Sequence, residues 1–399
     1  MNVTIRPSLA RGAVSAPPSK SAAHRAMLAA ALSDGCTVTG LGESADLRAT
    51  RECLLRMGAI AERSAEGERF GGLDPYRIPE CTVDCGESGS TLRFLLPLCL
   101  IGGNRITLTG RGRLLQRPLT EYAELCAGRG CAFELAEDHL TVCGRLRGGE
   151  FRIDGTRSSQ FVTGLLFALP LLKEDSTLII EGRAQSLSYV TMTEQILREF
   201  GIRFTKKNNV YRIPAAQHYR AERVSVEGDW SNAAFLYALN ELGGRAEITG
   251  LREDSAQGDR VLKEYFKRLG RETLDLSDCP DLAPVLFALS ALRGGSFTGC
   301  KRLRLKESDR ITAMQRELKK CGVTLSASED TVVISPEDLH PPQQPVDGHN
   351  DHRIVMAMAI LLTRLGGSIG GAEAVCKSWP NFFEVLEGLG IEVKYEQGT

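Results

Sequence analysis

The sequence predicts an α/β protein of two domains, each built from three copies of one repeating unit. With 399 residues the chain exceeds the size of a single ordinary core, so two domains are expected. Hydrophobic residues make up 42% of it and charged residues 25%, as in globular proteins. Self-similar segments recur with a period of roughly 70 residues, shortened in the fifth copy.

Each copy begins with an apolar segment of helical length, and a short β-like segment follows it. These first helices are apolar almost all round, which predicts that they are buried inside a domain. They begin near Ser21, Ser90, Ser159, Ser231, Asp281 and Asn350. The β-like segments that follow read CTVTG, RITLTG, STLIIEG, AEITG, SFTG and SIGG. Three such helices enclosed by sheets form one domain, and six form two.

The second helix of each copy carries polar and apolar residues at helical spacing and ends at a glycine. These glycines are Gly58, Gly130, Gly201, Gly270, Gly322 and Gly390. The period is too long for common solenoid repeats, which run about 20 to 50 residues. Each copy is therefore predicted to be a complete module of two helices and several strands.

Charge and composition exclude several classes of protein. Lys plus Arg number 49 against 50 for Asp plus Glu, a net charge of -1, so no overall field favours nucleic acid or an anionic membrane. Residues 1–9 lack the apolar run of a signal peptide, and the longest apolar runs, such as 354–362, are about half of what spans a bilayer. We expect a soluble, cytoplasmic protein.

Cysteine and histidine give no sign of a metal site. The twelve cysteines are scattered, without a C-x-x-C pair, which is typical of reduced thiols in a cytosolic protein. His349 and His352 adjoin Asp351 and Arg353, with no cysteine or second histidine pair beside them. We expect no metal.

Cations and hydroxyls gather where the first helices begin. Free N–H groups and the helix dipole favour an anion at such a position. Capping alone accounts for Ser90, Ser159 and Ser231. It does not account for Lys20, Arg25 and Arg353, because a cation in a first turn opposes the dipole by up to about 1 kcal/mol. A bound anion would reverse that penalty, so these helix starts are predicted to bind anions.

The second helices repeat this arrangement. Arg117 precedes a proline suited to a first turn, Lys306 and Arg310 lie one turn apart, and Lys377 opens the last helix. Lys306 and Arg310 alone would suggest a solvated charged face, but their place in the repeat favours a ligand. Nucleotide-binding glycine motifs and nucleophile signatures are missing from the sequence. The kind of chemistry that remains is proton transfer by Lys, Asp and Glu among bound anions, without a cofactor.

Five motifs, taken in order, resemble the 5-enolpyruvylshikimate-3-phosphate (EPSP) synthase family of enolpyruvyl transferases. They are P-S-K-S-x-x-x-R, D-G-T-R-S-S-Q-F, R-L-K-E-S-D-R, N-D-H-R and C-K-S-W-P-N-F-F-E. The resemblance implies a two-domain inside-out α/β barrel, of the α/β (α+β) class, with six β-α-β-α-β-β repeats. It also implies a lower domain of residues 1–16 plus 229–399 and an inserted upper domain of residues 17–228, with the active site in the cleft between them.

The resemblance implies transfer of the enolpyruvyl group of phosphoenolpyruvate to the 5-hydroxyl of shikimate 3-phosphate, a step toward chorismate and the aromatic amino acids. The residues implied for shikimate 3-phosphate are Lys20, Ser21, Arg25, Ser158, Ser159, Gln160, Ser186, Tyr189, Asp281 and Lys306. Those implied for phosphoenolpyruvate are Lys20, Gly89, Arg117, Gln160, Arg310, Arg353 and Lys377. Asp281 would accept the hydroxyl proton, and Glu307 and Lys20 are candidates for moving the methylene proton.

Electrostatics agrees with this assignment. Two unit charges 4 Å apart repel by about 4 kcal/mol at an effective dielectric of 20, so two adjacent anions need several cations. Neither domain carries the full set, which gives a reason for the domains to close. Glu87 and Phe94 depart from the common pattern beside the phosphoenolpyruvate pocket, and Gly89 leaves the space that the inhibitor glyphosate needs. We expect inhibition by glyphosate.

Two other functions stay open. One is enolpyruvyl transfer to a UDP-N-acetyl sugar, although that family has Lys-Asn where Lys20 and Ser21 stand, and a loop cysteine near the donor. The other is a non-catalytic protein that binds RNA ends, against which the balanced charge and missing nucleotide motif count. We expect a monomer that uses small-molecule substrates and binds neither nucleic acid nor membrane.

Overall fold

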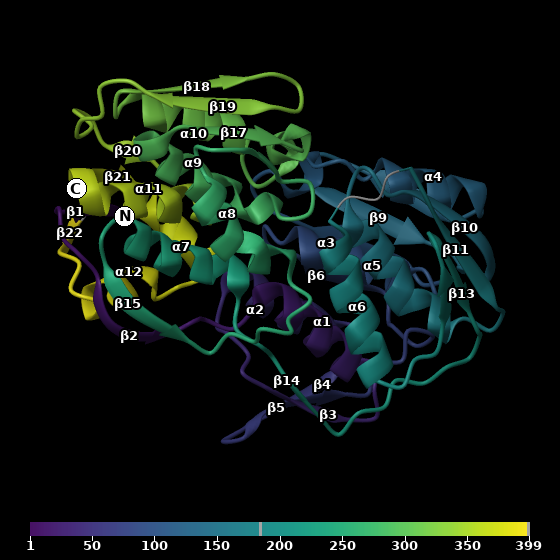
Figure 1. Cartoon of the computed structure of the whole chain (residues 1–399). Helices are drawn as coiled ribbons and strands as arrows, with labels where there is room; N and C mark the ends of the chain where they lie inside the picture. Colours follow the sequence, from purple (N-terminus) through teal and green to yellow (C-terminus); the bar gives the residue numbers. More distant parts are fainter. Residues whose placement is uncertain (183–185, 397–399) are drawn as a thin grey trace. The chain divides into compact units, whose positions relative to one another are not determined.

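The computed structural model describes residues 1–182 and 186–396 (Figure 1). The chain forms two compact units, Lys20–Val226 and a second that joins Met1–Ser19 to Glu227–Thr399. The chain thus passes between units at 19/20 and 226/227, whereas the predicted crossings are 16/17 and 228/229. Residues 397–399 of the predicted lower domain lie outside the described residues.

The Lys20–Val226 unit repeats one sheet pattern three times. Its strands are β3 (Cys36–Thr39), β4 (Ile60–Ser64), β5 (Gly67–Gly71), β6 (Cys81–Asp84), β7 (Ile106–Thr109), β8 (Ala132–Leu135), β9 (His139–Cys143), β10 (Gly149–Asp154), β11 (Ser176–Glu181), β12 (Thr205–Lys207), β13 (Val210–Ile213) and β14 (Arg223–Ser225). The sheet orders are β14-β3-β5-β4, β6-β7-β9-β8 and β10-β11-β13-β12. In each, the first pair is parallel and the other two are antiparallel.

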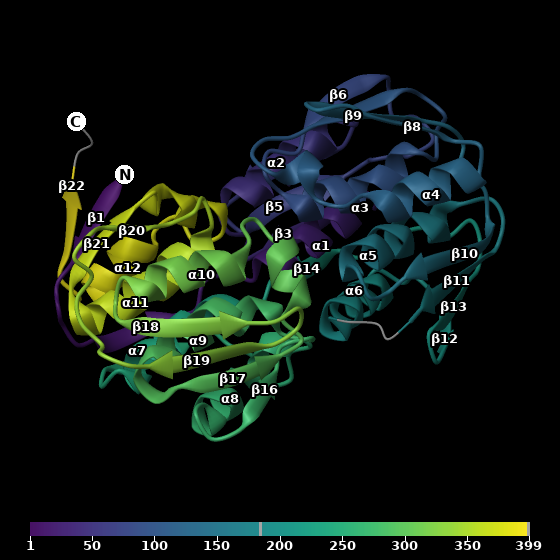
Figure 2. The same ribbon diagram turned by 90° about the horizontal axis from the view of Figure 1, so that it is seen from above.

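The helices of this unit fall into the two predicted types. They are α1 (Lys20–Ala31), α2 (Ala45–Arg56), α3 (Gly89–Cys99), α4 (Thr120–Gly128), α5 (Ser159–Ala168) and α6 (Leu187–Glu199), with short 3-10 turns η1 (Leu114–Gln116) and η2 (Leu169–Leu171). The first helices α1, α3 and α5 are buried along nearly their whole length, as predicted. Helix α5 packs on α3 and α6, and Figure 2 shows β10, β11 and β13 alongside α5 and α6.

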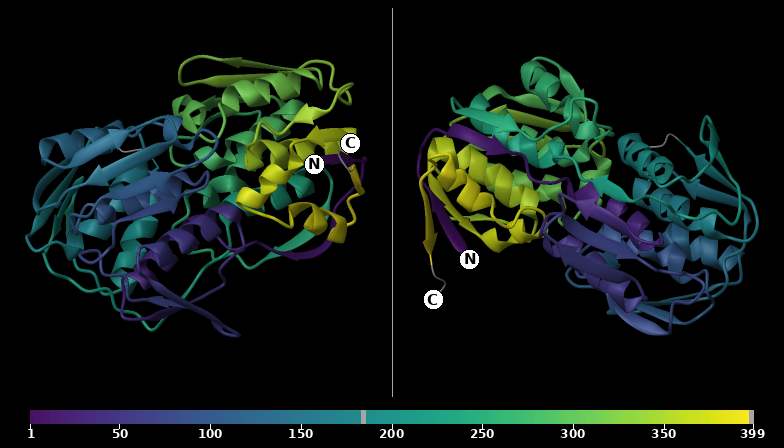
Figure 3. Two further views of the ribbon diagram at one scale, coloured as in Figure 1. Left: turned by 180° about the vertical axis from the view of Figure 1, so that it is seen from behind. Right: turned by 90° about the horizontal axis from the view of Figure 1, so that it is seen from below.

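The second unit is completed by the first residues of the chain. Its strands are β1 (Asn2–Ile5), β2 (Arg11–Ser15), β15 (Arg245–Thr249), β16 (Thr273–Asp275), β17 (Gly295–Thr298), β18 (Val323–Ala327), β19 (Val332–Pro336), β20 (Val346–Asp347), β21 (Gly367–Gly370) and β22 (Val393–Glu396). Sheets β16-β17-β19-β18 and β20-β21-β1-β22 keep the pattern, and β2 pairs with β15. Figure 3 shows β1, in purple, among the yellow C-terminal strands β21 and β22 that it pairs with.

Three buried helices form the core of this unit. Its helices are α7 (Trp230–Glu241), α8 (Leu262–Arg268), α9 (Ala283–Arg293), α10 (Arg310–Lys319), α11 (His352–Leu365) and α12 (Phe382–Gly388), with turns η3 (Gly258–Val261), η4 (Pro280–Leu282), η5 (Lys301–Leu305) and η6 (Ala372–Lys377). Helices α7, α9 and α11 contact one another, and residues 352–363 of α11 are all buried. Among the described residues, no helix is long and apolar enough to cross a bilayer.

The second helices end as predicted. Each is followed within three residues by a glycine of the left-handed region, where a side chain would be strained, with φ from 66° at Gly130 to 107° at Gly58. The predicted start of the fifth first helix is two residues early, because Asp281 lies in η4 and α9 begins at Ala283. The Asp281 carboxylate does not cap this helix; it contacts cations instead.

Candidate active site

Three cations converge on the carboxylate of Asp281. Arg310 lies 2.8 Å and Lys306 3.3 Å from Oδ1, and Arg353 lies 3.0 Å from Oδ2. Turn η4 supplies the acid, the N-terminus of α10 and the turn before it supply Arg310 and Lys306, and the N-terminus of α11 supplies Arg353. The predicted residues of this unit thus meet at three neighbouring helix starts.

Burial and the neighbouring charges shift the pKa values of the residues in this cluster. Burial acts to raise the pKa of Asp281, but Arg353, Lys306 and Arg310 outweigh it and hold that pKa well below its usual value. Burial lowers the pKa of Lys306 to about 8, although Asp281 opposes this shift. Asp281 is therefore ionised at neutral pH, and Lys306 loses its proton just above neutrality.

Asp351 is a functional residue that sequence reasoning missed. It is fully buried, accepts a hydrogen bond at 2.9 Å from Nε of Arg310 and one at 3.0 Å from Ser308, and caps α11. Glu307 contacts the same guanidinium at 2.8 Å. These carboxylates hold the pKa of Arg310 above its ordinary value despite burial. The sequence does not reveal this contact, because Arg310 lies 41 residues away from Asp351 along the chain.

Lys377 lies at the end of η6 and is buried. Its Nζ donates a hydrogen bond of 2.6 Å to the carbonyl of Asn350, next to the start of α11. Asp259 is a second missed acid in this unit: it is buried, accepts a 2.6 Å hydrogen bond from Ser231, and has a pKa raised to about 7 by burial and by the charge of Asp281. The predicted cap Ser231 is thus wrong, because Asp229 caps α7.

In the Lys20–Val226 unit, Arg25 joins the start of α1 to α5 and α6. Its guanidinium donates to Thr193 at 2.9 Å, to the carbonyl of Tyr189 at 3.0 Å and to the carbonyl of Ser21 at 2.7 Å. Burial lowers its pKa to about 10. These contacts order the first turn of α1, where Lys20 forms a 2.7 Å ion pair with Asp46 of α2. Asp46 was missed because it resembles an ordinary first-turn acid.

Two arginines approach the start of α3 at Gly89. A Cβ there would stand 2.6 Å from Nη1 of Arg117 and 2.8 Å from Nη1 of Arg93, so only glycine leaves these guanidinium groups in place. Arg93 binds Oε1 of Gln160 at 2.9 Å, and Gln160 donates to Ser90 at 3.0 Å. Nε of Arg117 is buried and has no hydrogen-bond partner among the described residues. A cation with a spare buried donor is suited to an anionic ligand.

The remaining predicted residues lie at the starts of α5 and α6. Ser158 caps α5, and Ser159 is buried beside it, so the predicted caps Ser159 and Ser90 are each late: Ser88 caps α3. Ser186 is buried in a left-handed conformation with φ 55°, and its carbonyl accepts from the N–H of Tyr189 at 3.1 Å. Of the predicted site residues, ten thus lie in this unit and six in the other. Most of them stand at helix starts, whereas Arg117 follows the turn η1 and Lys377 ends the turn η6.

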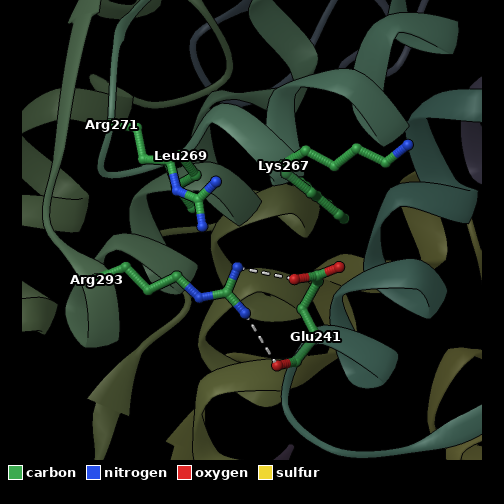
Figure 4. A pocket seen from close by; sticks show the side chains of 6 residues that line it. Glu241, Lys267, Leu269, Arg271 and Arg293 are labelled. Carbon is green, nitrogen blue, oxygen red and sulfur yellow. Dashed lines mark hydrogen bonds and ion pairs between the residues drawn. The ribbon is translucent and has the colours of Figure 1, made fainter.

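A pocket formed by described residues lies elsewhere (Figure 4). It has a volume of about 360 Å³ and is lined by Glu241, Phe266, Lys267, Leu269, Arg271 and Arg293, none of them a predicted site residue. Arg293 is paired with Glu241 at 2.8 Å. No group of three or more potential metal ligands occurs among the described residues.

Comparisons with known proteins agree on one family. Residues 6–386 match the profile of the family described as EPSP synthase (3-phosphoshikimate 1-carboxyvinyltransferase). The chain is 38% identical to the 3-phosphoshikimate 1-carboxyvinyltransferase of Clostridium kluyveri, over 98% of both chains. It is 37% identical to a protein of that name from Clostridium perfringens, over 99% of both chains. Its fold is similar to that of EPSP synthase from Acinetobacter baumannii, with a TM-score of 0.79 and 23% identity, over 99% of this chain and 100% of that one.

Proposed function

This chain belongs to the EPSP synthase family, and from that premise we propose that it transfers the enolpyruvyl group of phosphoenolpyruvate to the 5-hydroxyl of shikimate 3-phosphate and releases phosphate. The observation that carries the chemistry is the convergence of Lys306, Arg310 and Arg353 on the partly buried carboxylate of Asp281. A general base held among cations is what an addition between two anions requires.

Each substrate is bound by its own set of residues, and Lys20 and Gln160 belong to both sets. Shikimate 3-phosphate is bound by Lys20, Ser21, Arg25, Ser158, Ser159, Gln160, Ser186, Tyr189, Asp281 and Lys306. Phosphoenolpyruvate is bound by Lys20, Gly89, Arg117, Gln160, Arg310, Arg353 and Lys377. The spare buried donor of Arg117 and the backbone N–H groups at the starts of α1, α3 and α5 support this division.

Asp281 takes the proton of the 5-hydroxyl as that oxygen attacks the donor. A base with a strongly lowered pKa is weak, but its pKa is low because of the neighbouring cations. Bound phosphate and carboxylate groups neutralise those cations, so the pKa of Asp281 rises when both substrates are present. Glu307 and Lys20 are the candidates for delivering and recovering the methylene proton, and the arginines stabilise charge on the departing phosphate.

We propose that the six site residues of one unit and the ten of the other bind the same pair of substrates. Bringing both sets of cations onto the same anions is the physical reason for the units to close. We further propose that the enzyme is a cytoplasmic monomer that needs no cofactor. The twelve cysteines, all free thiols among the described residues, support the location.

A coupled phosphate-release assay tests this function. We expect the wild type to release phosphate only when phosphoenolpyruvate and shikimate 3-phosphate are both present. Asp281→Ala and Lys20→Ala should each lower kcat by about 100-fold or more, the range for loss of a general acid or base. Asp338→Ala and Lys207→Ala, which change exposed residues of the same types, serve as controls. Unchanged turnover in both site variants would refute the mechanism.

The same assay distinguishes the closest alternative. A UDP-N-acetyl sugar would replace shikimate 3-phosphate as acceptor if the chain were that other enolpyruvyl transferase. The names of the Clostridium relatives favour the shikimate acceptor. Phosphate release from phosphoenolpyruvate with the sugar nucleotide as acceptor, and none with shikimate 3-phosphate, would favour the sugar-nucleotide transferase. Salt-dependent RNA binding without any phosphate release would favour the RNA-end-binding alternative.

A further inference from the structure

The loop between β20 and α11 has an unusual backbone. His349 and Asn350 both adopt the left-handed conformation, with φ of 50° each. Asparagine tolerates this region, but histidine does so less often, and two successive non-glycine residues in it need outside support. The loop leads directly into Asp351 and the first turn of α11, where Arg353 lies.

A buried carboxylate on α10 supplies that support. Glu317 has a side chain only 2% exposed, and it accepts hydrogen bonds from Nε2 of His349 at 2.8 Å and from the backbone N–H of Asp347 at 2.9 Å. Lys320 lies 2.8 Å from it on the outer side. Burial acts to raise the pKa of Glu317, but His349 and the other donors lower it, so the acid is ionised. Glu317 therefore binds the chain at Asp347, the last residue of β20, and at His349 in the loop.

The loop in turn positions two cations of the site. The carbonyl of Asn350 accepts the 2.6 Å hydrogen bond from Lys377, and the N–H of Asp351 donates to the carbonyl of Gly348 at 2.9 Å. The carboxylate of Asp351 binds Arg310. A change in the backbone at residue 349 would thus move the Asn350 carbonyl that Lys377 binds and the Asp351 carboxylate that Arg310 binds.

We propose that Glu317 and His349 act as a clamp that positions Lys377 and Arg310 for phosphoenolpyruvate. The inference rests on the proposed function. His349 is a positioning residue, because it acts through Asn350 and Asp351. The clamp contacts the partners of the two phosphoenolpyruvate residues Lys377 and Arg310 directly. It reaches Asp281, which is assigned to shikimate 3-phosphate, only through Arg310, so the larger effect is expected on phosphoenolpyruvate.

Two substitutions separate the clamp from the backbone conformation. His349→Asn keeps a residue that tolerates the left-handed region but removes the reach to Glu317. His349→Gln keeps a long side chain with an N–H donor. We expect His349→Asn to raise the KM for phosphoenolpyruvate roughly tenfold, the equivalent of about 1.4 kcal/mol, with the KM for shikimate 3-phosphate within about twofold of the wild type. His349→Gln should recover part of the loss.

His340→Asn is the matched control, because the His340 ring bonds only to the neighbouring carbonyl of Pro341 among the contacts described. It should leave both KM values unchanged. Equal rises in both KM values, or a lower melting temperature with unchanged KM values, would assign His349 a structural role and overturn the clamp. An inactive wild type would instead overturn the proposed function, which keeps the two failures distinct.

Discussion

At the residue scale, several cations assigned to the substrates already hold a carboxylate of the protein. Lys20 contacts Asp46, Arg310 contacts Asp351, and Arg353 contacts Asp281. A buried charge without a partner is costly, so these acids stabilise the cations in the folded protein. They also keep the guanidinium and ammonium groups oriented before substrate arrives, which lowers the cost of ordering them on binding.

The pKa of Lys306 predicts a pH dependence. Because this pKa is lowered to about 8 in the folded protein, the ammonium group is lost above that pH. The KM for shikimate 3-phosphate should therefore rise up to tenfold per pH unit above about pH 8. Lys306→Arg should abolish this rise up to pH 10, since a guanidinium stays charged. Steady-state kinetics from pH 6.5 to 10 check this, and the same pH limb in both proteins would contradict it.

The lowered pKa of Lys306 has the opposite effect on the stability of the fold. An unfolded lysine has a pKa of about 10.4, so the unfolded chain binds more protons than the folded one between about pH 8 and that value. The burial cost of a charged Lys306 is present below pH 8 and is relieved as the pH rises through this window. Binding and folding therefore respond to the same proton in opposite directions.

Gly89 predicts a steric effect. In Gly89→Ala the new methyl group would stand 2.6 Å from Nη1 of Arg117, and the guanidinium would have to move. We expect the KM for phosphoenolpyruvate to rise by about tenfold or more, which corresponds to a loss of about 1.4 kcal/mol or more of binding free energy. The melting temperature should stay near that of the wild type, because a flexible side-chain end moves. Initial-rate kinetics with Gly128→Ala as control, where a Cβ meets no described atom within 4 Å, test this.

At the element scale, the sequence predicted helix order, burial and helix ends well. Six apolar segments and six glycines stand at regular intervals, and burial and chain reversal depend on local residue type. Partners of charged side chains were harder to predict. Asp351 and Asp46 follow the pattern of ordinary caps and first-turn acids, and their contacts with Arg310 and Lys20 depend on distances that only the fold sets. The caps were placed one or two residues late for the same reason.

The helix-ending glycines predict unequal costs. Gly58→Ala should lower the free energy of unfolding by about 1 kcal/mol, because φ is 107° and no described atom lies within 4 Å of the added Cβ. Gly322→Ala should cost at least twice as much, because its Cβ would also overlap the carbonyl oxygen of Asp338. Urea unfolding of both variants tests this; equal costs would show that the backbone at 322 relaxes.

At the scale of the whole molecule, the proposed closure predicts a change in size. Under the proposed function, cations of both units bind the same two anions, so the radius of gyration should fall when shikimate 3-phosphate and glyphosate are added together. Shikimate without its phosphate should have little effect. Small-angle scattering measures this, and an unchanged radius with both ligands bound would contradict closure.

The pairing of β1 with β21 and β22 sets an order of events during synthesis. All strands and helices of the Lys20–Val226 unit leave the ribosome within one continuous stretch, so that unit has every partner it needs early. Strands β1 and β2 precede that unit in the sequence but lack their neighbours until later: β2 until Arg245–Thr249, and β1 until Gly367–Gly370 and then Val393–Glu396. Strands β1 and β2 therefore stay unpaired while the Lys20–Val226 unit folds, and until their partner strands are made their open edges need protection by chaperones.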